Sequence, residues 1–317
     1  MRQALLDGIS ANPANPLPYI QAVCPSGECR WPDFGTLAIC SDVFNLTAQG
    51  NQTLLAELRK TTATRLDDLY RSAQSMFRLE IGVELIPPSF PLILGPLPYP
   101  TGHFNKSVEE LLIMDSFIAY SDTKFSRPEN GTFRDADLSS LRFLELGLFL
   151  CTKTLSSEVR GGISYTREVS SQARARKSVD TKLNYKWTMK FFTCYVTNTC
   201  PEVLGATELE LEPPPGAPGT GEYVVHLWSA LMSSALLFVT MFDAGLTDQG
   251  RGFLASNGGG ASAGLAPSLF GDLLATELPT PDEQLLGVRN VSRNIAQSLS
   301  NLLGPHAPFF SGSHGAQ

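Results

Sequence analysis

Alternating apolar and polar positions dominate the first two thirds of the sequence. Five segments have the pattern of strands, at 78–86, 109–120, 141–155, 164–169 and 186–196. The segment 141–155 is apolar on both faces, and the glycine pair Gly161-Gly162 predicts a hairpin turn after it. A cysteine-rich turn and a short strand are predicted before these segments, within residues 24–47. We therefore predict that residues 1–212 form a β-rich region.

Apolar residues spaced three and four apart predict amphipathic helices over about 53–77 and from Pro281 onward. Thr280, Pro281 and Glu283 match a capping box with proline at the first helical position. The apolar stripe of this last helix consists of Leu286, Val291, Ile295, Leu299 and Leu302.

A third apolar segment, residues 223–242, contains no acidic residue, lysine or arginine and is long enough to span a bilayer. Glu222 and Asp243 flank it, whereas membrane spans usually carry aromatic and basic anchors at their ends. We therefore interpret it as a buried core helix, with a membrane span as the alternative.

Proline and glycine mark the expected divisions of the chain. The run over 87–100 is rich in proline and is predicted to be a loop rather than a core strand. Residues 213–222 are predicted to be a Pro/Gly linker. We expect residues 223–303 to be a helical region that packs on the same domain, and residues 304–317 to be a disordered tail.

The charge of the chain narrows the choice of partners. Of the 317 residues, 17% are charged, against about 25% in an average soluble domain, and the net charge is -7. A negative chain repels the phosphate backbone, so no nucleic-acid partner is expected.

The six cysteines favour disulfides over metal binding or free buried thiols. They form one cluster of three and one of two, with one between, at Cys24, Cys29, Cys40, Cys151, Cys194 and Cys200. A zinc site would need paired thiolates with further pairs or histidines near by, and the four histidines lie far from the clusters in sequence. Cys194 and Cys200 are close enough to close a local loop. No metal or cofactor site is expected.

Glycosylation sequons support an oxidising compartment independently. Five N-x-S/T sequences occur, more than chance predicts, at Asn45, Asn51, Asn105, Asn130 and Asn290. Residues 1–15 have no apolar segment typical of a signal peptide. We interpret the chain as a fragment whose targeting segment lies upstream; the alternative is a cytosolic protein with accidental sequons.

One sequence resembles a catalytic motif. Residues 260–264 fit the G-x-S-x-G pattern in which Ser262 would be the nucleophile. That motif requires a strand before it and a helix after it, and here it lies in a Gly/Ser-rich stretch. We therefore predict no catalytic residue.

The segment CPSGECRWPDFGTLAIC, with Cys24, Cys29, Trp31, Pro32 and Cys40, resembles the cysteine block of a family of fungal membrane-anchored proteins known only as a domain of unknown function. Two later blocks of the family are similar to Glu145–Leu155 and to residues 294–301, so the resemblance spans about residues 5 to 303. Within the second block, Glu145, Leu148, Cys151, Lys153 and Thr154 are retained.

Two departures from the family pattern concern cysteines. Val43 and Leu146 occupy positions that are cysteine in the family, and their joint loss suggests that relatives bridge these two positions. The resemblance leaves Cys24, Cys29, Cys40 and Cys151 to form two bridges, for which three pairings are possible. Cys194 and Cys200 would form a third bridge. It also implies membrane helices before and after an extracytoplasmic domain.

The sequence therefore predicts an α+β fold, a β-rich disulfide-stapled extracytoplasmic domain with amphipathic helices packed on it. We expect a surface binding or sensing module for an extracellular or cell-wall ligand. It would be held at the membrane by segments outside this chain or, as the weaker alternative, by 223–242. The alternative function is a secretory-pathway enzyme of unrecognised type.

Overall fold

A computed structural model describes residues 7–8, 11, 17–19, 23–48, 83–85, 92–96, 103–121, 141–176, 208–216, 223–226, 245–246, 253–254 and 280–302. Its main element is an antiparallel sheet of seven strands, which are β1 (Cys29–Arg30), β2 (Phe34–Asn45), β3 (Val83–Leu85), β4 (Leu92–Pro96), β5 (Leu112–Ser121), β6 (Leu141–Arg160) and β7 (Ile163–Gln172). The sheet-rich fold with few helices confirms the predicted class at this level.

The long strand β6 organises the sheet. β2 and β1 pair along one of its edges, and β5 and β7 pair along the other, with β4 and β3 continuing beyond β5. Residues 143–155 of β6 are buried throughout, which confirms the prediction of a strand that is apolar on both faces. Gly161 and Gly162, with φ of 57° and 78°, form the predicted turn into β7, because glycine adopts positive φ without strain.

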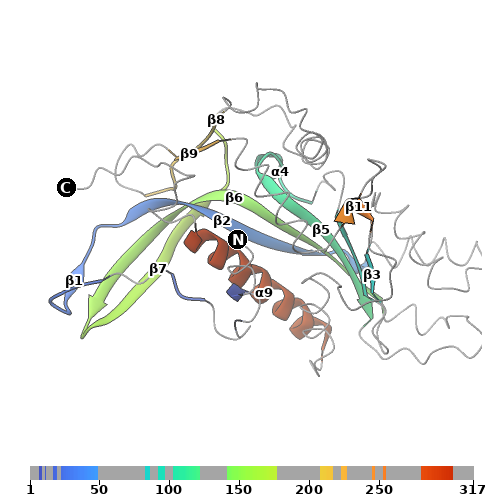
Figure 1. Ribbon diagram of the computed structural model, residues 1–317, viewed down its shortest axis with the longest axis horizontal. Helices are drawn as coiled ribbons and strands as arrows, with labels where there is room; N and C mark the ends of the chain where they lie inside the picture. The colour runs from blue at the N-terminus through green and yellow to red at the C-terminus, as the bar shows by residue number, and fades with distance from the viewer. Residues whose placement is uncertain are drawn as a thin grey trace, which may run out of the picture.

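The helix α9 (Pro281–Leu302) packs beside β2, and Figure 1 shows the long strands arching over it. Ser300 Oγ accepts a hydrogen bond from the Ile39 amide at 2.8 Å and donates one to the Ile39 carbonyl at 3.0 Å. Arg289 donates to the Val43 carbonyl at 3.2 Å. These side chains satisfy backbone groups on the side of β2 that faces away from β6, so α9 covers an open sheet edge.

The start of α9 confirms the predicted helix cap at Thr280, with the Glu283 carboxylate bonded to the Thr280 hydroxyl rather than to its backbone amide. The Glu283 amide donates to Thr280 Oγ1 at 3.3 Å, and that hydroxyl donates to the Glu283 carboxylate at 2.8 Å. Val291, Ile295 and Leu299 of the predicted stripe are buried. Leu286 is 55% exposed, so the prediction was wrong for this residue; Gln284 and Val288, two positions before and after it, are the buried residues of these turns.

A two-stranded hairpin, β8 (Glu208–Leu211) with β9 (Tyr223–His226), covers the opposite face of β6. Thr152 Oγ1 donates to the Glu212 carbonyl at 2.9 Å, and Thr154 Oγ1 donates to the Pro215 carbonyl at 3.0 Å. Because residues 152 and 154 alternate with those that face α9, the middle of β6 lies between two layers.

Further sequence predictions require correction. The run 87–100 is not loop throughout, because residues 92–96 form β4, with prolines only at its last position and just before it. The segment 223–242 does not begin as a helix, since 223–226 is a strand; a short apolar run fits either structure. The predicted linker 213–222 lies between β8 and β9, two strands that pair with each other.

The remaining elements of the described residues are short. A hairpin of β10 (Gly245–Leu246) and β11 (Phe253–Leu254) lies in the stretch predicted to be helical, and α4 (Lys106–Glu109) precedes β5. The strand expected at 109–120 therefore begins only at Leu112. The cysteine-rich turn leads into a strand of 12 residues rather than a short one. The helix predicted at 53–77 and the strand at 186–196 lie outside the described residues.

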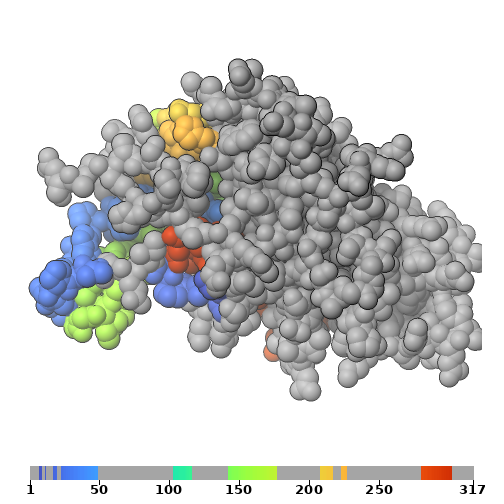
Figure 2. Space-filling view, in the orientation of Figure 1, coloured from blue at the N-terminus to red at the C-terminus, as the bar shows by residue number. Residues whose placement is uncertain are grey.

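The strand β1 and the β6–β7 hairpin form one end of the sheet. Figure 2 shows this end, in blue and light green, at the lower left edge of the view. Among the residues that the structure describes, no helix is long and apolar enough to cross a bilayer.

Candidate functional site

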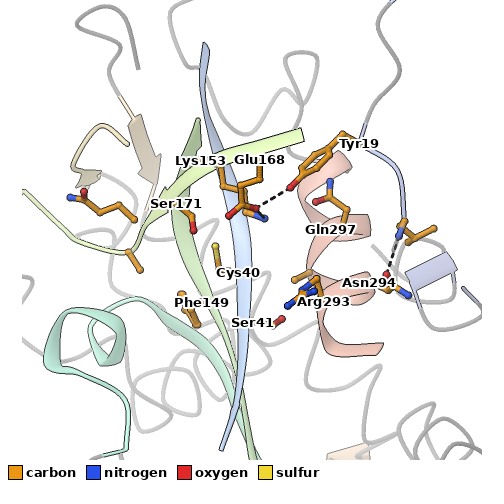
Figure 3. Close-up of a pocket in the computed structure, with 14 residues that line it drawn as sticks. Tyr19, Cys40, Ser41, Phe149, Lys153, Glu168, Ser171, Arg293, Asn294 and Gln297 are labelled. Carbon is orange, nitrogen blue, oxygen red and sulfur yellow. Dashed lines mark hydrogen bonds and ion pairs between the residues drawn. The ribbon is translucent and has the colours of Figure 1, made fainter. Parts of the chain in front are cut away.

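A cavity of about 300 Å³ lies between α9 and the sheet (Figure 3), and we call it the helix–sheet cavity. Its walls come from β2, β6, β7, α9 and the segment Leu17–Tyr19. The residues on which its chemistry depends are Tyr19, Ser41, Lys153, Glu168, Ser171, Arg293 and Gln297. The volume is at the lower end of the range for small-molecule sites.

An ion pair forms the floor of this cavity. Lys153 Nζ lies 2.9 Å from Glu168 Oε2, and Lys153 is only 8% exposed. A β-bulge lets the two side chains meet, because Thr154 pairs with Ser170 whereas Leu155 pairs with Glu168. The extra residue in β7 places the Glu168 side chain on the same face of the sheet as Lys153.

Tyr19 closes one side of the cavity over this ion pair. Its hydroxyl donates to Glu168 Oε2 at 3.0 Å, and Lys153 Nζ lies 5.8 Å from the centre of the Tyr19 ring. Burial raises the pKa of Tyr19, and the negative charge of Glu168 raises it further. Tyr19 therefore stays a neutral hydrogen-bond donor rather than acting as a base.

The Glu168 carboxyl stays ionised for a different reason. Burial alone would raise its pKa, but hydrogen bonds and the charge of Lys153, with further hydrogen bonds from Ser171 and Tyr19, lower the pKa below its ordinary value. Lys153 and Glu168 therefore neutralise each other within the cavity.

The segment Leu17–Tyr19 is fixed to α9 by two hydrogen bonds. The Leu17 amide donates to Asn294 Oδ1 at 3.0 Å, and Asn301 Nδ2 donates to the Pro18 carbonyl at 3.2 Å. Asn294 is only 1% exposed, so its position is set by packing. The helix thereby places Tyr19 opposite β7.

Arg293 is the remaining charged group of the cavity. Figure 3 shows it extending from α9 toward Ser41. Within the described part of the chain, its guanidinium takes part in no hydrogen bond or ion pair. With Lys153 and Glu168 paired, the lining keeps a net charge of one positive unit, together with hydroxyl and amide groups from Ser41, Ser171 and Gln297. This arrangement suits a small polar anion.

Four of the predicted disulfide cysteines form two bridges. Cys24 pairs with Cys29, and Cys40 pairs with Cys151, at Cα–Cα distances of 6.0 and 5.9 Å. The second bridge runs diagonally between β2 and β6, since Cys40 lies directly opposite Phe149, and Cys40 also lines the helix–sheet cavity. Cys194, Cys200 and Ser262 lie outside the described residues. Two disulfides indicate an oxidising environment for this chain.

Three of the predicted glycosylation sites are described. Asn45 at the end of β2 and Asn105 before α4 are exposed, and Asn105 Oδ1 accepts the Val108 amide at 3.0 Å as the helix cap. Asn290 is half-buried within α9, and the hydroxyl of its sequon, on Ser292, is fully buried. Asn51 and Asn130 lie outside the described residues.

The sequence did not point to the residues of this cavity as a site. Tyr19, Glu168 and Arg293 are far apart in the chain, and none belongs to a recognised motif. Lys153 gave a usable signal, because it is a cation within a strand that is largely apolar on both faces. A charge in that position needs a partner, and the partner marks the cavity.

The chain matches no family model, and neither the curated proteins nor the solved structures contain one that is significantly similar to it.

Proposed function

We propose that this chain is the extracytoplasmic domain of a membrane-associated fungal protein that binds a small hydroxylated organic anion, such as a sugar acid. Arg293 is the observation that carries the proposal. Its guanidinium faces a cavity whose other two charges are already paired with each other. A carboxylate would accept hydrogen bonds from the guanidinium fork and balance its charge.

The rest of the cavity supplies specificity for a hydroxylated ligand. Ser41, Ser171 and Gln297 offer donors and acceptors, and the Tyr19 ring gives one flat apolar wall. A cell-wall or other extracellular sugar acid combines a carboxylate with several hydroxyls. The two disulfides support the extracytoplasmic location, and the exposed Asn45 and Asn105 are accessible for glycosylation.

The strand register supports the proposed relation to the fungal family. Val43 on β2 is the direct partner of Leu146 on β6. The two positions that carry cysteine in the family are therefore opposite each other, where side chains of neighbouring strands are close enough for a disulfide. Nothing in the local sequence of either segment requires this pairing.

Calorimetric titration with a matched pair of sugars tests the binding proposal. Glucuronate and glucose differ in a carboxylate, so the protein should bind glucuronate and not glucose. Arg293→Gln should weaken glucuronate binding about tenfold or more, because a hydrogen bond to a charged group contributes about 1.5 to 3 kcal/mol. Arg174→Gln removes the same charge outside the cavity and should leave the affinity unchanged. Equal binding of both sugars, no binding of glucuronate, or normal binding by Arg293→Gln would contradict the proposal.

A further inference from the structure

A second cavity, of about 520 Å³, lies at the end of the sheet formed by β1 and the β6–β7 hairpin, and we call it the arginine cavity. Arg30 from β1, Arg160 from β6 and Arg167 from β7 line it, together with Glu158 and Tyr165. This end of the sheet lies at the lower left edge of the view in Figure 2. It is distinct from the helix–sheet cavity, although Tyr19 borders both.

The strand register directs the three arginines to one face. Glu158 is the direct partner of Arg30 on β1 and of Tyr165 on β7. Arg160 lies two residues beyond Glu158, and Arg167 is the partner of Ser156. Neighbouring strands are about 4.8 Å apart and alternate residues about 6.6 Å apart, so these side chains cover one small area.

The charge of this area contrasts with that of the whole chain. Three arginines face a single glutamate, which gives a local charge of two positive units in a protein of net charge -7. Arg160 binds Glu158 at 2.8 Å. The guanidinium groups of Arg30 and Arg167 take part in no hydrogen bond or ion pair with any residue the structure describes. Each guanidinium therefore has its donors available for an anion.

Large apolar side chains surround the same end of the sheet. Ile163 is 58% exposed and Tyr165 is 52% exposed, and the register places both on the face that carries the arginines. Val23, next to the Cys24–Cys29 loop, is 86% exposed. That loop touches the β6–β7 turn, since the Gly162 amide donates to the Gly27 carbonyl at 3.0 Å. Exposed aliphatic and aromatic side chains beside arginines are the combination found where proteins bind membrane interfaces.

We propose that this end of the sheet docks on a phospholipid surface. Arg30, Arg160 and Arg167 bind lipid phosphates, because a guanidinium fork matches phosphate oxygens and is attracted to an anionic surface. Ile163 and Tyr165 enter the headgroup region. The proposal does not depend on ligand binding in the helix–sheet cavity, and it adds a membrane contact made by the folded domain itself.

Co-sedimentation with vesicles tests the proposed membrane docking, using variants that alter only exposed side chains. The protein should bind vesicles of mixed phosphatidylcholine and phosphatidylglycerol more tightly than phosphatidylcholine alone, and added salt should weaken the binding. Arg30→Gln with Arg167→Gln should reduce the affinity roughly thirtyfold, at about fivefold for each arginine. Ile163→Ser with Tyr165→Ser should weaken binding to both kinds of vesicle.

The matched control is Arg174→Gln with Arg176→Gln, which removes two positive charges outside the arginine cavity and should change the affinity little. Circular dichroism and thermal unfolding confirm that each variant is folded. Equal loss in the control, or no binding to anionic vesicles, would overturn the proposal. A calorimetric titration with inorganic phosphate distinguishes the other source of phosphate. Binding of free phosphate without vesicle association would also overturn membrane docking.

Discussion

Residues 143–155 and residues 156–160 belong to the same strand, β6, and have opposite surroundings. The first part lies between α9 and the β8–β9 hairpin, and Leu148 at its centre is fully buried. The second part is flanked by the two-residue strand β1 and by β7, whose Ile163 and Tyr165 are more than half exposed. One strand thus supplies both the core of the domain and an accessible surface. Changes in the middle should therefore alter stability, and changes at the end should alter binding.

The two disulfides give the largest expected contrast. Cys40–Cys151 joins residues 111 apart across the core, whereas Cys24–Cys29 joins residues 5 apart near the exposed end. Loop-closure entropy predicts that Cys40→Ala with Cys151→Ala lowers the free energy of unfolding by about 5 kcal/mol, and Cys24→Ala with Cys29→Ala by about 2 kcal/mol. Chemical denaturation of both double variants measures the difference. Equal losses would show that the core and the exposed end of the sheet are equally constrained.

Apolar truncations should separate the same two regions less strongly. Leu148→Ala leaves a cavity in the core and should cost about 2 to 5 kcal/mol in the free energy of unfolding. Ile163→Ala, at the exposed end, should change it by no more than about 0.5 kcal/mol. Urea denaturation gives both values. A loss above about 2 kcal/mol for Ile163→Ala would mean that the end of the sheet is part of the core.

The smallest effect concerns Glu168, where the buried and exposed parts meet. Its pKa is lowered in the folded state, so the unfolded state takes up a proton first as the pH falls. This contribution to stability is complete above the ordinary carboxyl pKa of 4.5 and disappears as the pH falls through the lowered value. Because the side chain is 34% exposed, we expect no more than about 1 kcal/mol.

Denaturation at several pH values between pH 7 and pH 3, a range that spans the ordinary carboxyl pKa, isolates this contribution when wild type is compared with Glu168→Gln. The variant should lose less stability on acidification, because it has no carboxyl to protonate at that position. Glu158→Gln, which breaks an exposed ion pair at the end of the sheet, is the matched control. Its loss of stability on acidification should be closer to that of wild type. Identical pH profiles for wild type and Glu168→Gln would refute the lowered pKa.

The strong local patterns predicted the framework of the fold. The alternation in 141–155, the Gly161-Gly162 turn and the capping box at Thr280 all gave the correct element, because each is set by neighbouring residues. The strand at residues 92–96 was missed because the surrounding prolines concealed a segment whose pairing depends on the distant β5. The strand at 223–226 was missed because its apolar sequence fits helix and strand equally.

The candidate site was not predictable in the same way. Tyr19, Lys153, Glu168 and Arg293 are brought together only by tertiary packing. The orientation of Glu168 depends on a bulge in β7 that no turn residue marks. The cysteines combine a feature that the sequence predicted with one that it did not. Their number and clustering predicted disulfides, but only the β2–β6 register decided among the three possible pairings.

We infer that this chain is an extracytoplasmic domain whose core is closed by the bridge between β2 and β6. Mass spectrometry of non-reduced peptides, from protein secreted by a eukaryotic host, tests it most directly. We expect a cross-linked peptide pair containing Cys40 and Cys151 and a separate peptide with Cys24 joined to Cys29. Free thiols at Cys40 and Cys151, or either one bridged to another cysteine, would contradict it.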